Sequence, residues 1–231
     1  MEGELRTPPR PLGGAARVVI ILLALGALVN GVSLVVEAVH VGILQQLDRG
    51  VNVDIDKVSA SDARVGASAF AQIVVYVLTI VGFLVWFHRA YANLPRLGAR
   101  WLRFGRGWAI GAWFVPFLNL WRPKQIANDI WRASDPDAPA YLDAGWPKTR
   151  VPALLHWWWA MWLVSSFLDR GASNADADAS TLPDQIDAAY ALIVADALGI
   201  VAAALAATVV WRISGRQDER ARRLGERGDL G

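Results

Sequence analysis

Asp196 is the residue with the clearest chemical potential, because it interrupts an apolar run long enough to cross a membrane. The run covers 188–211 and holds no other charged residue. A carboxylate in hydrocarbon costs roughly 2.5–3.5 kcal/mol on insertion scales, so Asp196 should face other helices. Other long apolar runs carry polar side chains at an outer-half depth: Gln72, Asn30, Ser165 and Ser166. This intramembrane polar layer predicts a proton or cation relay or a small polar ligand site, and hence a small transporter or channel. The alternative is hydrogen bonding between helices, worth about 0.6–2 kcal/mol per contact.

A second group of residues combines cations, amides and tryptophans near the middle of the chain. Its members are Arg89, Asn93, Asn119, Arg122, Arg132, Trp121 and Trp131. Basic side chains beside a membrane attract anionic lipid head groups, and aromatic side chains prefer the head-group level. The group therefore predicts a surface that binds an anionic lipid or a membrane protein partner. The simpler interpretation is that these arginines only mark the cytoplasmic side and extend toward water.

Metal or haem chemistry has weaker support. His88 and His156 are both expected near the inner face, but two histidines without a carboxylate or thiolate at fixed spacing are a poor ligand set. The chain has no cysteine. It also lacks a P-loop, a G-x-S-x-G, an H-E-x-x-H and a dinucleotide fingerprint. We therefore expect a protein that is not an enzyme and needs no cofactor, with the haem or metal redox protein as the remaining alternative.

The elements that position these residues are four long uncharged runs. The 231 residues are 55% hydrophobic, and almost all charge lies between the runs. Each run is near the 20 residues that a transmembrane helix needs. We predict an all-α integral membrane fold in which 18–211 is the transmembrane domain, between a flexible cytoplasmic tail at 1–17 and a cytoplasmic tail at 212–231. The four spans are expected at about 18–37, 65–87, 151–168 and 188–211.

The connecting segments receive separate predictions. Residues 41–64 and 169–187 are acidic and are expected as outer loops, the first with a short interfacial helix. The uncharged stretch 107–121 would reach only about 22 Å as a helix, against roughly 30 Å of hydrocarbon. We predict that it re-enters or lies at the interface, with an amphipathic helix following at 123–133. The whole re-entrant or interfacial segment is thus 107–133.

The basic residues set the orientation. With both termini inside and four spans, the inner segments hold 19 of the 23 Lys and Arg residues, as the positive-inside rule expects. The net charge is only +2, and the basic residues flank apolar runs, so membrane topology explains them better than nucleic acid does. We therefore expect a multi-pass protein of the bacterial cytoplasmic membrane with the lipid bilayer as its surroundings.

Several short motifs strengthen this prediction. They are Trp86-Phe87-x-Arg89, Gly107-Trp108-Ala109-x-Gly111-x-Trp113-Phe114-x-Pro116, Asn119-Leu120-Trp121-Arg122-Pro123, Ile130-Trp131-Arg132-Ala133-Ser134 and Trp157-Trp158. Together they resemble a family of actinobacterial polytopic membrane proteins known only as a domain of unknown function. The resemblance covers about residues 71–210. It implies a membrane location and a multi-pass topology, and it implies no activity, substrate or cofactor.

Overall fold

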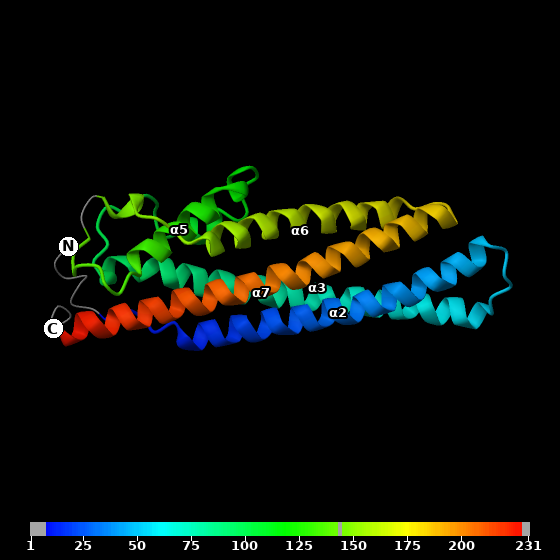
Figure 1. Cartoon of the computed structure of the whole chain (residues 1–231), viewed down its shortest axis with the longest axis horizontal. Coiled ribbons are helices and arrows are strands. Elements are labelled where there is room, and N and C mark those ends of the chain that lie inside the picture. Colours follow the sequence, from blue (N-terminus) through cyan, green and yellow to red (C-terminus); the bar gives the residue numbers. More distant parts are fainter. Residues whose placement is uncertain (1–7, 143–144, 228–231) are drawn as a thin grey trace. The chain divides into compact units, whose positions relative to one another are not determined.

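The computed structural model describes residues 8–142 and 145–227 as an all-α protein (Figure 1). Four long helices dominate: α2 (Gly13–Asp48), α3 (Ile55–Ala92), α6 (Ala153–Asp178) and α7 (Leu182–Glu226). Shorter elements lie between α3 and α6, namely η1 (Leu94–Leu97), α4 (Trp108–Gly111), η2 (Leu118–Leu120), α5 (Arg122–Ala133) and η3 (Trp146–Lys148). The predicted fold class is therefore confirmed as all-α.

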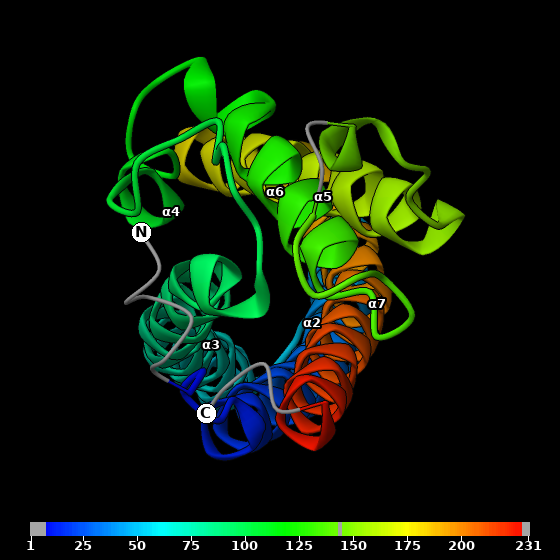
Figure 2. The ribbon, with the colours of Figure 1, turned by 90° about the vertical axis from the view of Figure 1, so that its left-hand side faces the viewer.

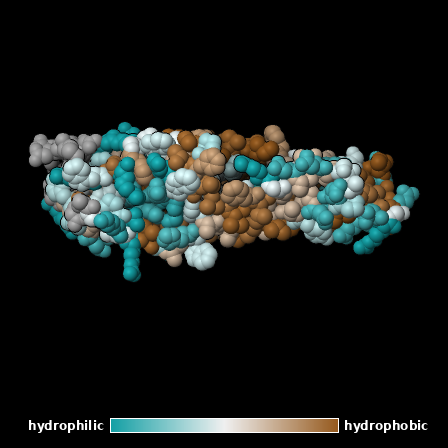
Figure 3. Space-filling view, turned by 90° about the horizontal axis from the view of Figure 1, so that it is seen from above, coloured by the Kyte–Doolittle hydropathy of each residue, from teal (hydrophilic) through white to brown (hydrophobic). Residues whose placement is uncertain are grey.

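Three of the long helices are long and apolar enough to cross a membrane. These helices are α2, α3 and α7, and in their most apolar windows only 11%, 17% and 28% of the residues are buried by protein. Figure 3 shows broad hydrophobic surface, in brown, on the face that it draws. Soluble monomers rarely expose apolar areas of this extent. The fourth helix, α6, is not one of these three: its first half carries tryptophans and His156, and its second half carries Asp169, Arg170, Asp176 and Asp178.

The long helices extend well beyond the predicted spans. Residues 41–48 and 55–64 are helical, so the predicted outer loop is reduced to a turn at 49–54. Residues 179–181 are all that separates α6 from α7, where a loop over 169–187 was expected. Polar residues exposed to water also form helices. The end of an apolar run therefore marks where the chain leaves the predicted span and does not mark the end of the helix. At the N-terminus, α2 begins at Gly13 within the predicted tail, while 1–7 and 228–231 lie outside the described residues.

The chain divides into two compact units, and each long helix contributes to both. We call the first the Trp-rich unit; it is formed by the described residues within Met1–Ile21, Ile80–Trp159 and Ala207–Gly231. The second, the Asp196 unit, comprises Leu22–Thr79 and Ala160–Ala206.

The Trp-rich unit has an aromatic core. Phe83, Trp86, Phe87, Trp113, Trp158 and Trp159 form a continuous set of ring contacts with centroids 5.4–6.3 Å apart. The core also holds the fully buried Ile126 and Ile130 of α5, the amphipathic helix that the sequence predicted from position 123. The loops around α5 can be followed in Figure 2. Aromatic side chains from α3, α6 and the segment 107–121 thus form the interior of this unit, although most aromatic residues of 107–121 are exposed.

The stretch 107–121 is a broken segment and not a single helix. It contains the four residues of α4 and the three of η2. Between them Pro116 lacks an amide hydrogen, and Phe117 takes a left-handed φ of 63°. Both features end a helix, because proline cannot donate the backbone bond and a side chain at positive φ is strained. Phe114 and Phe117 are exposed there, at 67% and 75%.

A buried arginine joins two loops of the same unit to α7. Arg220 is 1% exposed, and its guanidinium donates hydrogen bonds to the carbonyl oxygens of Leu97 (2.7 Å), Asp135 (2.5 Å) and Pro139 (2.9 Å). Burial lowers the pKa of Arg220 to about 10. The two loops also meet directly, because the amide of Leu142 donates to the carbonyl of Gly98 at 3.1 Å. Gly98 has a φ of 86°, and a Cβ there would lie 1.7 Å from the carbonyl oxygen of Ala140.

Candidate functional site

Three of the residues predicted for the polar layer form a hydrogen-bonded cluster in the Asp196 unit. The side-chain amide of Gln72 on α3 donates to the Asp196 carboxyl at 2.6 Å and lies 3.2 Å from the Asn30 side-chain oxygen. Ser33 of α2 is a further hydrogen-bond partner of Asp196. Asp196 is 8% exposed and Ser33 is 3% exposed. Three helices therefore supply one buried polar cluster, and the pairing of Asp196 with Gln72 and Asn30 agrees with their predicted depths.

A glycine on α7 lets the Asn30 side chain of α2 come close to α7. A Cβ on Gly199 of α7 would lie 2.6 Å from the Asn30 side-chain nitrogen. Gly199 lies three residues after Asp196 and so on the same side of the helix. A larger residue at position 199 would displace Asn30. Gly199 thus has the role that small residues commonly have in membrane proteins, which is to let two helices pack closely.

The two serines predicted for this layer have other surroundings. The Ser165 hydroxyl donates to the carbonyl of Trp162, one turn earlier in α6, at 3.2 Å. Ser166 is half-buried on the same helix. No hydrogen bond among the described residues links either serine to Asp196. The sequence reasoning instead missed Ser33 and the buried Glu37, which lie three and seven residues after Asn30 on one face of α2.

The predicted inner-face residues do not form one pocket in the Trp-rich unit. Asn93 is buried as a structural link: it accepts from the amide of Arg10 at 2.9 Å, and its side-chain nitrogen donates to the Arg10 carbonyl at 2.8 Å. Arg89 is exposed on α3, and Asn119 is half-buried in η2. Trp131 packs beneath the guanidinium of Arg216, 4.3 Å from its ring centroid. These residues therefore hold the unit together or lie apart.

A smaller set of cations does come together along α5. Burial and the nearby Arg132 guanidinium lower the pKa of Lys124 to about 8. Lys124 also acts electrostatically on His156 at the start of α6, and Arg132 does so more weakly. The carboxylate within reach, Asp129, is already held by Arg103, and its contact with Arg132 is 3.8 Å long. Lys124, Arg132 and His156 thus act on one another electrostatically where one acid serves two arginines, an arrangement that favours an anion.

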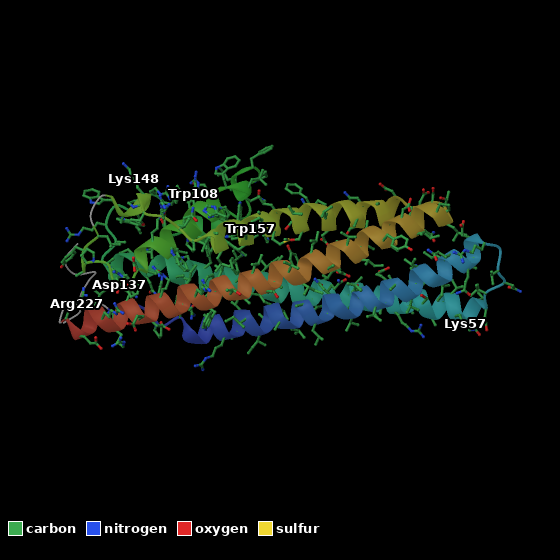
Figure 4. The ribbon with its side chains drawn as sticks, viewed as in Figure 1. Lys57, Trp108, Asp137, Lys148, Trp157 and Arg227 are labelled. Atoms are coloured by element: carbon green, nitrogen blue, oxygen red, sulfur yellow. The ribbon has the colours of Figure 1, made fainter. Side chains whose placement is uncertain are left out.

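Aromatic side chains lie beside another basic residue of α5, Arg122. The Arg122 guanidinium lies over the rings of Phe104 (4.4 Å) and Trp108 (5.1 Å), and its Nε has no hydrogen-bond partner among the described residues. Trp108 and Trp121 are 38% and 46% exposed. Figure 4 labels Trp108 on α4, together with Trp157 at the start of α6. We call Arg122, Lys124, Arg132 and His156 the basic cluster.

The histidines show no metal-site geometry. Within 8–142 and 145–227, no group of three His, Cys, Asp or Glu side chains is arranged to hold a metal ion. The electrostatic neighbours of His156 are cations, which oppose a second positive charge. Its position beside Lys124 is a feature that the sequence spacing alone does not reveal.

These features define a class: an all-α protein with apolar helices that fit a membrane, a buried polar cluster and a basic cluster among aromatics. The chain belongs to the family described as Domain of unknown function (DUF4328), whose model matches residues 49–215. That match covers more than half of the chain and confirms the predicted membership of a family of unknown function. No curated protein and no solved structure matches the chain.

Proposed function

We propose that this protein is a four-span membrane protein that binds an anionic lipid head group at its cytoplasmic face through the basic cluster. The proposed spans are the apolar parts of α2, α3, α6 and α7, with both termini in the cytoplasm of a bacterial cell. The proposed role is non-enzymatic.

Two observations support the fourth span. Helix α6 has 26 residues, about 39 Å at 1.5 Å per residue, which exceeds the hydrocarbon thickness of roughly 30 Å. A four-span topology also leaves 19 of 23 basic residues inside.

The observation that carries the lipid proposal is that Lys124, Arg132 and His156 act on one another electrostatically while the one carboxylate in contact with them, Asp129, is shared between Arg132 and Arg103. A phosphate group would supply the missing negative charge. Arg122 and the exposed rings of Trp108, Phe117 and Trp121 would then lie beside the head group and the upper acyl chains. On this proposal, 107–121 is an interfacial anchor and does not cross the membrane.

Lipid binding to the purified protein tests this function. We would replace Lys124 and Arg132 with Gln and measure cardiolipin and phosphatidylglycerol binding by native mass spectrometry. Each lost charge should weaken binding about fivefold, since a juxtamembrane cation contributes about 1 kcal/mol. Arg222→Gln is the matched control, because Arg222 is exposed and paired with Glu219 and Glu226. Equal affinity of the double variant and the control would rule out the basic cluster as the lipid site.

The Asp196 cluster favours a second candidate, a small transporter or channel. Buried ionisable groups inside spans commonly mark ion or substrate paths. Flux measured in proteoliposomes, with wild-type protein and Asp196→Asn, distinguishes this candidate from a lipid-binding role.

A further inference from the structure

Glu37 is the described acid whose burial is least compensated. Its side chain lies on α2 and the residue is 4% exposed. Among the described residues, none donates a hydrogen bond to its carboxyl, and its electrostatic neighbours are Asp176 and Asp196. A buried carboxylate without a donor or a cation is costly in its charged form. The Glu37 side chain is thus largely enclosed, and no hydrogen-bond donor or cation among the described residues lies beside its carboxyl, whose oxygens are not among the fully buried unpartnered atoms.

Glu37 belongs to the same polar surface as the Asp196 cluster. Asn30, Ser33 and Glu37 follow one another at spacings of three and four, so they lie along one face of α2. Ser33 hydrogen-bonds with the Asp196 carboxyl, and Asn30 accepts a hydrogen bond from Gln72, which in turn donates to Asp196. Glu37 is therefore one helical turn from a group that already hydrogen-bonds Asp196.

The groups that face these two acids do not neutralise them. From α3 comes Gln72, which is uncharged. From α6 come Asp176, which acts on Glu37, and Asp169, which acts on Asp196. Arg170 acts on Asp169 and on Tyr76. The surrounding field is negative, so two ionised carboxylates would repel each other in a medium of low dielectric.

A route for protons continues along α2 toward the surface. His40 lies three residues beyond Glu37, with its ring nitrogen 3.1 Å from the Ser61 hydroxyl and 3.8 Å from the Asp62 carboxylate. The Asp62 side chain is 62% exposed. His40 thus contacts an exposed carboxylate and a hydroxyl, and it lies one helical turn beyond Glu37 on α2.

We propose that Glu37 and Asp196 form a proton-binding site that retains one proton at neutral pH. The proton satisfies the unpartnered Glu37 or the carboxyl of Asp196 and removes one of two like charges. The inference is independent of the lipid proposal, and it gives the second candidate function its ligand. A metal ion has less support, because the described residues hold no three-ligand group.

Infrared spectroscopy of the full chain in detergent tests the proposal without requiring flux. We expect the carbonyl band of a protonated carboxyl at neutral pH, lost as the pH is raised. Glu37→Gln and Asp196→Asn should each shift that loss to lower pH, since the remaining acid no longer faces a like charge. The double variant should lack the band, while Asp48→Asn, which removes an exposed acid of α2, should leave it unchanged.

A second measurement needs no variant. A hydrophobic carbodiimide reacts with protonated carboxyls in apolar surroundings, and peptide mapping should find the label on Glu37 or Asp196. Three results would overturn the proposal: no protonated band in wild-type protein at neutral pH, a band that the double variant retains, or a band that responds to Na⁺ at constant pH. The last would assign the site to an alkali cation. Absence of flux in proteoliposomes with wild-type protein that shows the band would reject the transporter and leave the proton site standing.

Discussion

Because Gly199 has no side chain, Asn30 can lie close to α7 and hydrogen-bond with the groups around Asp196. Asn30 approaches so closely that a Cβ at 199 would lie 2.6 Å from its amide nitrogen. Asn30 is the hydrogen-bond partner of Gln72, and Gln72 is that of Asp196. One small residue on α7 therefore supports a chain of bonds that crosses three helices.

Gly199→Ala should accordingly destabilise the protein although alanine is the better helix former. We expect a loss of about 1 kcal/mol, because Asn30 must move and its bond to Gln72 weakens. Gly215→Ala, on the same helix with nothing within 4 Å of its Cβ position, should be neutral or gain up to about 1 kcal/mol. Thermal unfolding in detergent measures both, and equal midpoints would mean that the close approach has no energetic weight.

Lys124 gives the lipid site a pH dependence. Burial and Arg132 lower the pKa of Lys124 to about 8, so its charge is present below that pH and is lost above it. Binding of an anionic lipid should therefore weaken as the pH rises from about 7 to about 9. Lys124→Arg keeps its charge throughout and should bind equally at both pH values. A binding curve of wild-type protein that is flat over this range would contradict the role given to Lys124.

At the scale of elements, the C-terminal part of α7 acts as a structural core helix. Ile213, Gln217, Arg220 and Leu224 are buried at spacings of three and four, the pattern of one helix face. Gln217 donates to the carbonyl of Ala90 at 2.9 Å, and Ser214 accepts from the Trp86 ring nitrogen at 2.9 Å. The sequence predicted a mixed-charge cytoplasmic tail over 212–231, with a continuing helix that frays at Gly225 and Gly228 as one interpretation. It did not predict a buried face, because a face with two polar members has no strong apolar signal.

Arg220→Gln should therefore loosen the loops that Arg220 joins. A buried guanidinium bonded only to carbonyl oxygens leaves several acceptors unsatisfied when removed, so we expect a loss of roughly 3 kcal/mol or more. Limited proteolysis should show new cleavage within 135–142. Arg222→Gln, two residues away and exposed, should change stability by less than about 1 kcal/mol. Identical protease patterns for the two variants would show that the Arg220 bonds are dispensable.

The sequence predicts features that follow from local helix geometry better than features that depend on contacts between distant segments. Depth arithmetic along apolar helices placed Asp196 beside Gln72 and Asn30, because helix rise is constant. The same hydropathy reasoning treated Glu37 as the end of a span, although α2 continues to Asp48. Contacts between distant loops, such as Arg220 with the carbonyl of Leu97, have no local signature. For this reason the sequence predicted an inner-face pocket from residues of which several serve as structural links.

For the whole molecule, the number of spans decides the side on which each loop lies. Three helices have the length and composition of spans, and α6 is the proposed fourth. If α6 crosses, Ser173 is outside while Lys148 and Arg222 are inside. If it does not, Ser173 stays with Lys148 and Arg222 moves to the other side.

Single cysteines test this, because the natural chain has none. Cysteines at Ser173, Lys148 and Arg222, all exposed positions, would be treated in whole cells with a reagent that does not cross membranes. We expect labelling at Ser173 alone. Labelling at Arg222 but not at Ser173 would establish three spans and remove the topological basis of the lipid proposal.

The surroundings of Asn93 have a consequence for the order of assembly during synthesis. Its side chain bonds the backbone of Arg10, near the beginning of the chain, and also the Gln217 side chain, 124 residues later, at 3.1 Å. At about 5–20 residues per second, a ribosome needs roughly 6–25 s to add the residues between Asn93 and Gln217. During that interval Asn93 and the carbonyl of Ala90 lack their last partners. The Trp-rich unit therefore completes these hydrogen bonds only after the C-terminal part of α7 has been made, and a nascent chain that stalls earlier lacks them.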